Sequence, residues 1–157
     1  MKKRIIVCGY PKSGNTWLTR LTAEIVGCPV AGYWFQPWTD DEAIEGTERI
    51  SDHLCFKSHH CIEAMNETLE HYAFGNEKII YLMRDPRDVL ISARHYFSIT
   101  PRHPRLHGYM SSLPGGKRVY DRLFHTESYL LDTLAEGLIK GTREGSWLHI
   151  PWKEHVS

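Results

Sequence analysis

The chain has 157 residues, which is enough for one domain with a substantial hydrophobic core. Hydrophobic residues make up 41% and charged residues 24%, the proportions of an ordinary globular protein, and the formal net charge is zero. No overall positive field therefore favours nucleic acid or an anionic membrane as a partner, and no apolar run approaches the roughly 20 residues of a membrane span.

The first predicted unit is a strand, a glycine-containing loop and a helix. The apolar run within residues 4–9 predicts a buried strand, and apolar residues at helical spacing predict a helix over residues 16–27. The loop between them reads Gly9-Tyr10-Pro11-Lys12-Ser13-Gly14-Asn15-Thr16-Trp17. Loop and first-turn N–H groups without backbone partners, together with the helix dipole, make such a segment a phosphate cradle.

The loop departs from the triphosphate-binding pattern Gly-x4-Gly-Lys-Ser/Thr. Asn15 stands where that pattern has lysine, and the lysine of this chain, Lys12, lies inside the loop. Thr16 retains the hydroxyl that follows the lysine in that pattern. The sequence thus predicts phosphate binding but argues against an ATPase or GTPase, and a tight turn with a solvated lysine is the alternative.

Further strands and helices alternate along the chain. We expect strands at the start of 30–38, at 53–56 and at 78–83, and helices at 62–74, 86–97 and 119–139. Asp85 suits the N-cap of the 86–97 helix and Pro86 its first position, while residues 99–118 read as a loop. The aromatic residues Trp34, Phe35 and Trp38 are equally consistent with core packing and with the wall of a ligand pocket.

This order predicts an α/β fold: a three-layer parallel β-sheet flanked by helices, with strands buried on both faces. Three polar clusters each follow a predicted strand: the glycine loop, Lys57 to His60, and Arg84 to Asp88. Because parallel strands end at the same edge of a sheet, all three clusters are expected at one ligand-binding edge.

The second cluster contains a base and a cation. Histidine titrates near neutrality, so His59 suits proton removal from an attacking hydroxyl or amine, and His60 is its rival. Lys12 and Lys57 suit stabilisation of a negatively charged leaving group. A metal site at His59-His60-Cys61 and a pair of polar loop histidines are the alternatives.

The motifs resemble those of sulfotransferases that use 3′-phosphoadenosine 5′-phosphosulfate (PAPS). Pro11-Lys12-Ser13-Gly14-Asn15-Thr16-Trp17 is similar to the family's 5′-phosphosulfate loop, and Lys57-Ser58-His59 to its Lys-Thr-His segment. Arg84-Asp85-Pro86-Arg87-Asp88-Val89-Leu90-Ile91-Ser92 resembles its 3′-phosphate motif. Near the chain end, Trp152 to Val156 looks like a tryptophan–histidine–valine segment of the family, with Trp147 as a competing match.

The resemblance implies a P-loop NTPase-like fold and a PAPS-dependent enzyme without a required metal. It implies His59 as general base with Lys12 and Lys57 as stabilising cations. The implied cofactor-binding residues are Lys12, Ser13, Gly14, Asn15, Thr16, Trp17, Arg84 and Ser92. The implied acceptor is a small alcohol, phenol or amine, and the implied location is the cytoplasm. The acceptor's identity and the oligomeric state are not indicated.

Segments that the family carries after the tryptophan–histidine–valine segment have no match, so we expect residues 1–157 to form the first half to two-thirds of a single domain. Two other functions remain open: an ATP-dependent small-molecule kinase, and an inactive nucleotide-binding or interaction module. Cys8, Cys28, Cys55 and Cys61 show no metal spacing and no disulfide framework, which favours a reducing compartment.

Overall fold

The computed structural model describes residues 2–34, 41–61, 63–67, 77–99, 112, 114–115, 127–141 and 150–157. They divide into two compact units, residues 1–84 with 152–157, and residues 85–151. The predictions for Phe35, Trp38 and most of the 99–118 loop fall outside the described residues. Within the described residues, no helix is long and apolar enough to cross a membrane.

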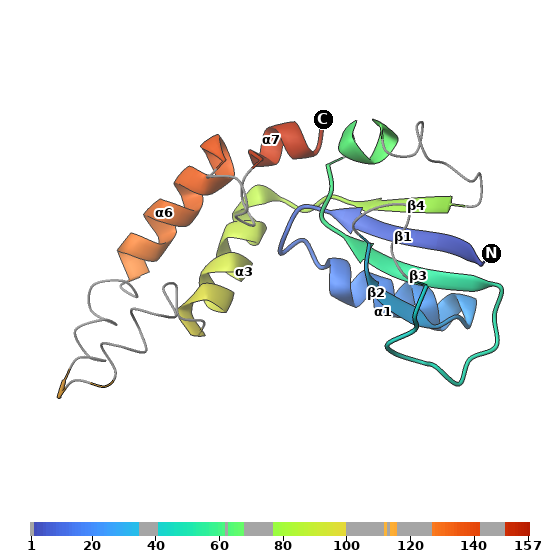
Figure 1. Ribbon diagram of the computed structural model, residues 1–157. Helices are drawn as coiled ribbons and strands as arrows, with labels where there is room; N and C mark the ends of the chain where they lie inside the picture. Colours follow the sequence, from blue (N-terminus) through green and yellow to red (C-terminus); the bar gives the residue numbers. More distant parts are fainter. Residues whose placement is uncertain are drawn as a thin grey trace. The chain divides into compact units, whose positions relative to one another are not determined.

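The first unit is built on a parallel sheet of four strands in the order β2-β3-β1-β4 (Figure 1). The strands are β1 (Lys3–Gly9), β2 (Val30–Tyr33), β3 (His53–Ser58) and β4 (Glu77–Leu82). Helix α1 (Asn15–Val26) follows β1, and the short helix α7 (Trp152–His155) belongs to the same unit. This arrangement confirms the predicted α/β fold and the predicted strand–loop–helix start.

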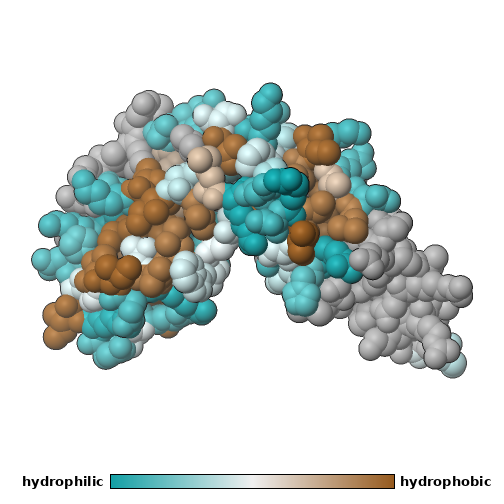
Figure 2. All heavy atoms as spheres, turned by 180° about the vertical axis from the view of Figure 1, so that it is seen from behind, coloured by the Kyte–Doolittle hydropathy of each residue, from teal (hydrophilic) through white to brown (hydrophobic). Residues whose placement is uncertain are grey.

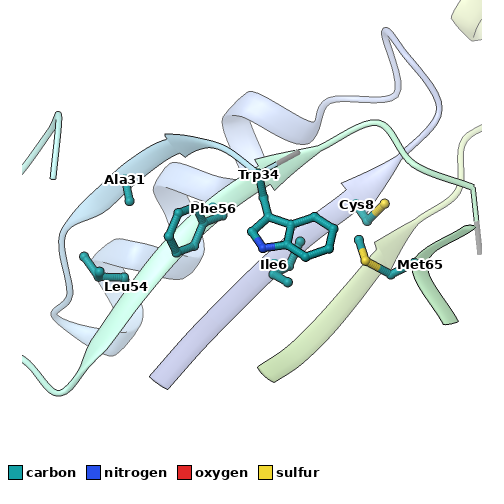
Figure 3. Packing of buried hydrophobic residues seen from close by; sticks show 7 residues of the cluster. All are labelled: Ile6, Cys8, Ala31, Trp34, Leu54, Phe56 and Met65. Atoms are coloured by element: carbon teal, nitrogen blue, oxygen red, sulfur yellow. The ribbon is translucent and has the colours of Figure 1, made fainter. Parts of the chain in front are cut away.

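The central strands are packed on both faces, because alternate side chains point to opposite sides of a strand. On one face, Ile5 and Val7 of β1 and Cys55 of β3 pack with residues of α1. On the other face, Ile6 and Phe56 belong to a cluster whose centre is the indole of Trp34 (Figure 3). This cluster contains Ile6, Cys8, Ala31, Trp34, Leu54, Phe56 and Met65.

Helix α1 was predicted correctly as an element, but most of its large apolar side chains do not lie on its buried face. Ile25 is 77% exposed and Leu21 is 38% exposed, whereas the buried residues are Asn15, Thr19, Thr22 and Ala23. Small and polar side chains allow the helix to approach the sheet closely, and Thr19 satisfies its hydroxyl by donating to the carbonyl of Asn15 at 2.8 Å. The surface seen in Figure 2 includes several apolar areas.

Strand β4 was expected to be buried on both faces, and this expectation was wrong. Ile79 and Ile80 are 37% and 36% exposed, and Lys78 is exposed as well. β4 pairs with β1 and ends the order of the described sheet, and no described helix packs extensively on its faces. An apolar run identifies a strand but does not show whether the strand is central.

The second unit contains α3 (Pro86–Ile99) and α6 (Glu127–Lys140), which pack against each other. Val89, Ala93 and Leu134 are its buried apolar residues among those described. Asp85 precedes α3 and accepts a hydrogen bond from the main-chain N–H of Arg87 at 2.8 Å, which confirms the predicted helix start.

Candidate active site

The loop after β1 forms a tight turn that ends at an uncapped helix. The N–H of Ser13 donates to the carbonyl of Tyr10 at 3.1 Å, and Lys12 has a φ of 68°. Gly14, the N-cap residue of α1, has a φ of 110°, and no side chain caps the helix there. A residue with a side chain is strained at that φ, so glycine is required. The first-turn N–H groups are therefore available to bind an anion.

Two side chains of this loop suit the same anion. Ser13 is only 6% exposed, and its hydroxyl oxygen has no hydrogen-bond partner among the described residues. A buried hydroxyl without a partner is costly, so a ligand or water is expected to satisfy it. Partial burial lowers the pKa of Lys12, which indicates that its ammonium group is drawn away from bulk water.

Lys57, near the end of β3, reaches the start of α1. Its Nζ donates to the hydroxyl of Thr16 at 3.2 Å and lies 5.6 Å from the centre of the Tyr33 ring. This contact brings the second polar cluster against the first, as expected from the parallel sheet. A pocket of about 320 Å³ opens beside these side chains, and its wall includes Tyr33, Ile44 and the ion pair of Arg20 with Glu45.

His59 lies directly at the junction of β1 and β3. Its Nδ1 is 3.0 Å from the carbonyl oxygen of Gly9 and 2.8 Å from the amide nitrogen of Asn15. Burial lowers the pKa of His59, although the hydrogen bond to Gly9 works in the opposite direction. The ring is therefore neutral at pH 7, which is the form that can accept a proton.

The neighbouring histidine has a different environment. Nδ1 of His60 is 2.6 Å from the hydroxyl of Ser58, and its ring packs edge-on against Trp34 with 5.6 Å between ring centres. Trp34 is 1% exposed and belongs to the core. The interpretation of Trp34 as a core residue is thus confirmed, and the alternative interpretation, that it forms the wall of a pocket, was wrong.

The third predicted cluster is divided between the two units. Arg84 belongs to the first unit, where its Nη1 donates to the carbonyl of Lys12 at 3.3 Å. Ser92 lies on α3 in the second unit. Arg84 is therefore at the glycine loop as expected, while a shared 3′-phosphate site of Arg84 and Ser92 stays a prediction.

A contact with α7 is not evident from the sequence. His155 is 2% exposed, and its Nε2 donates to the main-chain carbonyl of His59 at 2.9 Å. Its Nδ1 is 2.5 Å from the hydroxyl of Tyr81, and its ring lies edge-on to Tyr10. The sequence marks this segment only through its family resemblance, which gives no contact partner.

The cysteines are buried side chains of the protein interior. All four are buried and free, and burial raises the pKa of Cys8 to about 12. Cys61, part of the alternative metal site, accepts a hydrogen bond from the N–H of Ala64 at 3.4 Å. Among the described residues, no group of three or more His, Cys, Asp or Glu side chains could hold a metal ion.

Comparisons with known proteins identify the family. The sulfotransferase domain family matches residues 2–136. Human sulfotransferase 2A1 is 32% identical over 105 residues, covering 59% of this chain and 34% of its own length. A 3-alpha-hydroxysteroid sulfotransferase from Cavia porcellus is 28% identical over 161 residues, covering 88% of this chain and 54% of its own length.

A solved structure has the same fold. The crystal structure of mouse sulfotransferase SULT7A1 complexed with PAP aligns with 99% of this chain and 46% of that one, with a TM-score of 0.55 and 22% identity. The chain spans about a third to a half of the length of these relatives. Because the family matches most of its length, the chain belongs to the sulfotransferase domain family.

Proposed function

We propose that this chain carries the donor-binding and catalytic part of a PAPS-dependent sulfotransferase. The observation that carries the proposal is the meeting of Lys57 with Thr16 at the start of α1, beside the buried hydroxyl of Ser13. Such an arrangement can bind an anionic group at the helix N-terminus, and its cations can stabilise the negative charge that develops during group transfer. The mouse sulfotransferase of similar fold was crystallised as a complex with PAP, which supports the same donor class.

The residues of the loop fit the phosphosulfate end of PAPS. Ser13 has an unsatisfied hydroxyl, Lys12 has a partly desolvated ammonium group, and α1 offers uncapped N–H groups. Gly14 brings the backbone close to the ligand without a side chain in the way. When bound, PAPS supplies the sulfuryl group and leaves as adenosine 3′,5′-bisphosphate. Trp17, which is 69% exposed, is proposed to stack on the adenine.

His59 is proposed as the general base and takes the acceptor's proton as the hydroxyl or amine attacks. Its lowered pKa keeps it neutral at pH 7, and its ring is close to Tyr33, with 5.4 Å between ring centres. Lys12 and Lys57 are proposed to stabilise the charge that develops on the leaving phosphate. His60 is less suited, because its ring packs against Trp34 in the core.

The acceptor is proposed to be a small alcohol, phenol or amine. Two relatives are named for 3-alpha- and 3-beta-hydroxysteroids, so hydroxysteroids are the first compounds to screen. Arg84 and Ser92 are proposed to bind the 3′-phosphate, without a metal ion. A cytoplasmic location completes the proposal and rests on the family resemblance.

The test is calorimetric titration with adenosine 3′,5′-bisphosphate, with ATP as the comparator. We expect a Kd of about 1 μM or lower, equivalent to about −8 kcal/mol, and much weaker binding of ATP. Ser13→Ala and Arg84→Ala are expected to weaken bisphosphate binding, while Lys153→Ala, an exposed change on α7, is the matched control.

The outcomes separate the remaining functions. A preference for ATP would favour the kinase alternative. Binding of the bisphosphate without sulfuryl transfer to any acceptor, in wild type and His59→Ala alike, would favour an inactive binding module. A folded chain that binds neither nucleotide would overturn the proposed donor site.

A further inference from the structure

Asn15, the first residue of α1, has a buried side chain that points at the ends of two strands. The residue is 2% exposed, and its Nδ2 lies 2.6 Å from the carbonyl oxygen of Gly9 and 3.1 Å from that of Ser58. Gly9 ends β1 and Ser58 ends β3. Both oxygens can only accept hydrogen bonds, so the amide nitrogen, and not its oxygen, must face them.

The ring of His59 completes this cluster. Its Nδ1 is 2.8 Å from Nδ2 of Asn15 and 3.0 Å from the carbonyl oxygen of Gly9. A neutral imidazole carries one N–H, so Nδ1 either donates to Gly9 or accepts from the amide. The two arrangements place the ring lone pair on different nitrogens.

The count of hydrogens favours donation from the ring. The amide of Asn15 has two hydrogens, and the carbonyls of Gly9 and Ser58 can take one each. If Nδ1 of His59 then donates to Gly9, these contacts make three hydrogen bonds to carbonyls, and the extra bond must outweigh the repulsion between two donor nitrogens that lie 2.8 Å apart at the shared Gly9 oxygen. If the amide donated to the ring instead, one carbonyl contact would lose its hydrogen, which is unfavourable in a buried site.

We propose that Asn15 is a positioning residue: by donating to the carbonyls of Gly9 and Ser58, it leaves His59 protonated on Nδ1 and places the lone pair on Nε2. The inference rests on the proposed role of His59 as base, because Nε2 must then receive the acceptor's proton. After that transfer the ring is an imidazolium, and its Nδ1–H stays on the carbonyl of Gly9.

The side chain of Asn15 fits its place closely. A Cβ added to Gly9 would lie 2.8 Å from Oδ1 of Asn15 and would collide with the carbonyl of Leu82. The main chain of Asn15 is held by Thr19, whose hydroxyl donates to the Asn15 carbonyl at 2.8 Å. The side chain of Asn15 thus packs inward between β1 and β3, in contact with the proposed base.

The test is nuclear magnetic resonance of the histidine ring nitrogens in the full chain, which requires no catalytic activity. The His59 signals are assigned by their loss in His59→Gln. We expect the Nδ1–H form in the wild-type chain and a mixture of both neutral forms in Asn15→Ala. Thr22→Val is the matched control, because it changes another buried polar side chain of α1, about two helical turns from Asn15.

Asn15→Asp keeps the shape but cannot donate to the two carbonyls. Its carboxylate would stabilise a positive charge on His59, so the ring is expected to titrate at higher pH. The other groups around His59 are Lys57 on β3, His60 next in the chain, Tyr33 on β2 and His155 on α7, and they are the same in both proteins.

Activity gives a second readout. If the chain is active, Asn15→Ala is expected to lower kcat about tenfold or more with a smaller change in KM for the donor. A wild-type ring protonated on Nε2, or variants with an unchanged protonation pattern and unchanged titration, would overturn the proposal. Failure of nucleotide binding would instead overturn the proposed function and leave the ring measurement intact.

Discussion

Strands β3 and β4 both end in polar clusters, but they differ in how the protein surrounds them. Leu54, Cys55 and Phe56 of β3 are 0% exposed, whereas Ile79 and Ile80 of β4 are more than a third exposed. His59 after β3 is held by Gly9, Asn15 and, through its carbonyl, His155. The comparison indicates that His59, the proposed base, is positioned by groups at the buried end of β3, so core changes near β3 should affect the candidate site most.

The largest expected effect is on stability. Phe56→Ala removes a fully buried ring from the cluster around Trp34 and is expected to lower the free energy of unfolding by about 3–5 kcal/mol. Ile80→Ala on β4 is expected to cost about 1 kcal/mol, because the side chain is 36% exposed. Chemical denaturation of both variants measures the difference, and equal losses would contradict the comparison.

The sequence predicted the elements well because their signals are local. Glycines and prolines mark the turns, and apolar runs mark the strands. It could not predict that Thr19 and Thr22, and not Ile25, form the buried face of α1, because that choice depends on how closely the helix approaches the sheet. It also could not predict that β4 ends the described sheet, since pairing order is set by long-range contacts.

The candidate site likewise combines features that the sequence predicts with long-range contacts that it does not. The topology of a parallel sheet was sufficient to bring Lys57 against Thr16 and Arg84 against the loop. The link from His155 to the carbonyl of His59 joins residues 96 positions apart, and neither residue carries a local signal for it. The inward side chain of Asn15 was missed because the loop pattern treats that position as part of a phosphate site.

The next effect concerns the junction of β1 with β4. Gly9→Ala places a Cβ against the carbonyl of Leu82, which is main chain and cannot move aside like a side chain. We expect a loss of about 1–3 kcal/mol in the free energy of unfolding and weaker binding of adenosine 3′,5′-bisphosphate. Gly27→Ala is the control: its φ of 70° disfavours alanine, but nothing lies within 4 Å of the added Cβ. It should reduce stability without reducing nucleotide binding by the folded protein.

A smaller set of contacts, made by His155 of α7, connects Tyr81 of β4 with His59 after β3. His155→Ala removes the donor to the carbonyl of His59 and the partner of Tyr81, and leaves buried polar groups behind. The expected loss is about 1–3 kcal/mol by chemical denaturation. Lys153→Ala, on the exposed side of the same helix, should leave stability nearly unchanged. A similar loss in both variants would show that α7 acts through its presence alone and not through His155.

The last prediction compares how the stability contributed by His59, after β3, and by Asp85, after β4, depends on pH. Burial lowers the pKa of His59 below its usual 6.5, so the unfolded chain binds more protons than the folded one in that range. The stability contributed by neutral His59 is therefore present above about pH 6.5 and is lost as the pH falls below it. The side-chain hydrogen bond from Arg87 lowers the pKa of Asp85 from 3.8 to about 2, so its contribution is lost only in stronger acid. Unfolding measured against pH for His59→Gln and Asp85→Asn should flatten the curve near neutrality in the first variant and only below about pH 4 in the second. A His59→Gln curve parallel to that of the wild-type chain between about pH 5.5 and 7.5, one unit either side of the ordinary histidine value, would mean that His59 is not held neutral by burial, and the contrast between the two strand ends would lose its electrostatic basis.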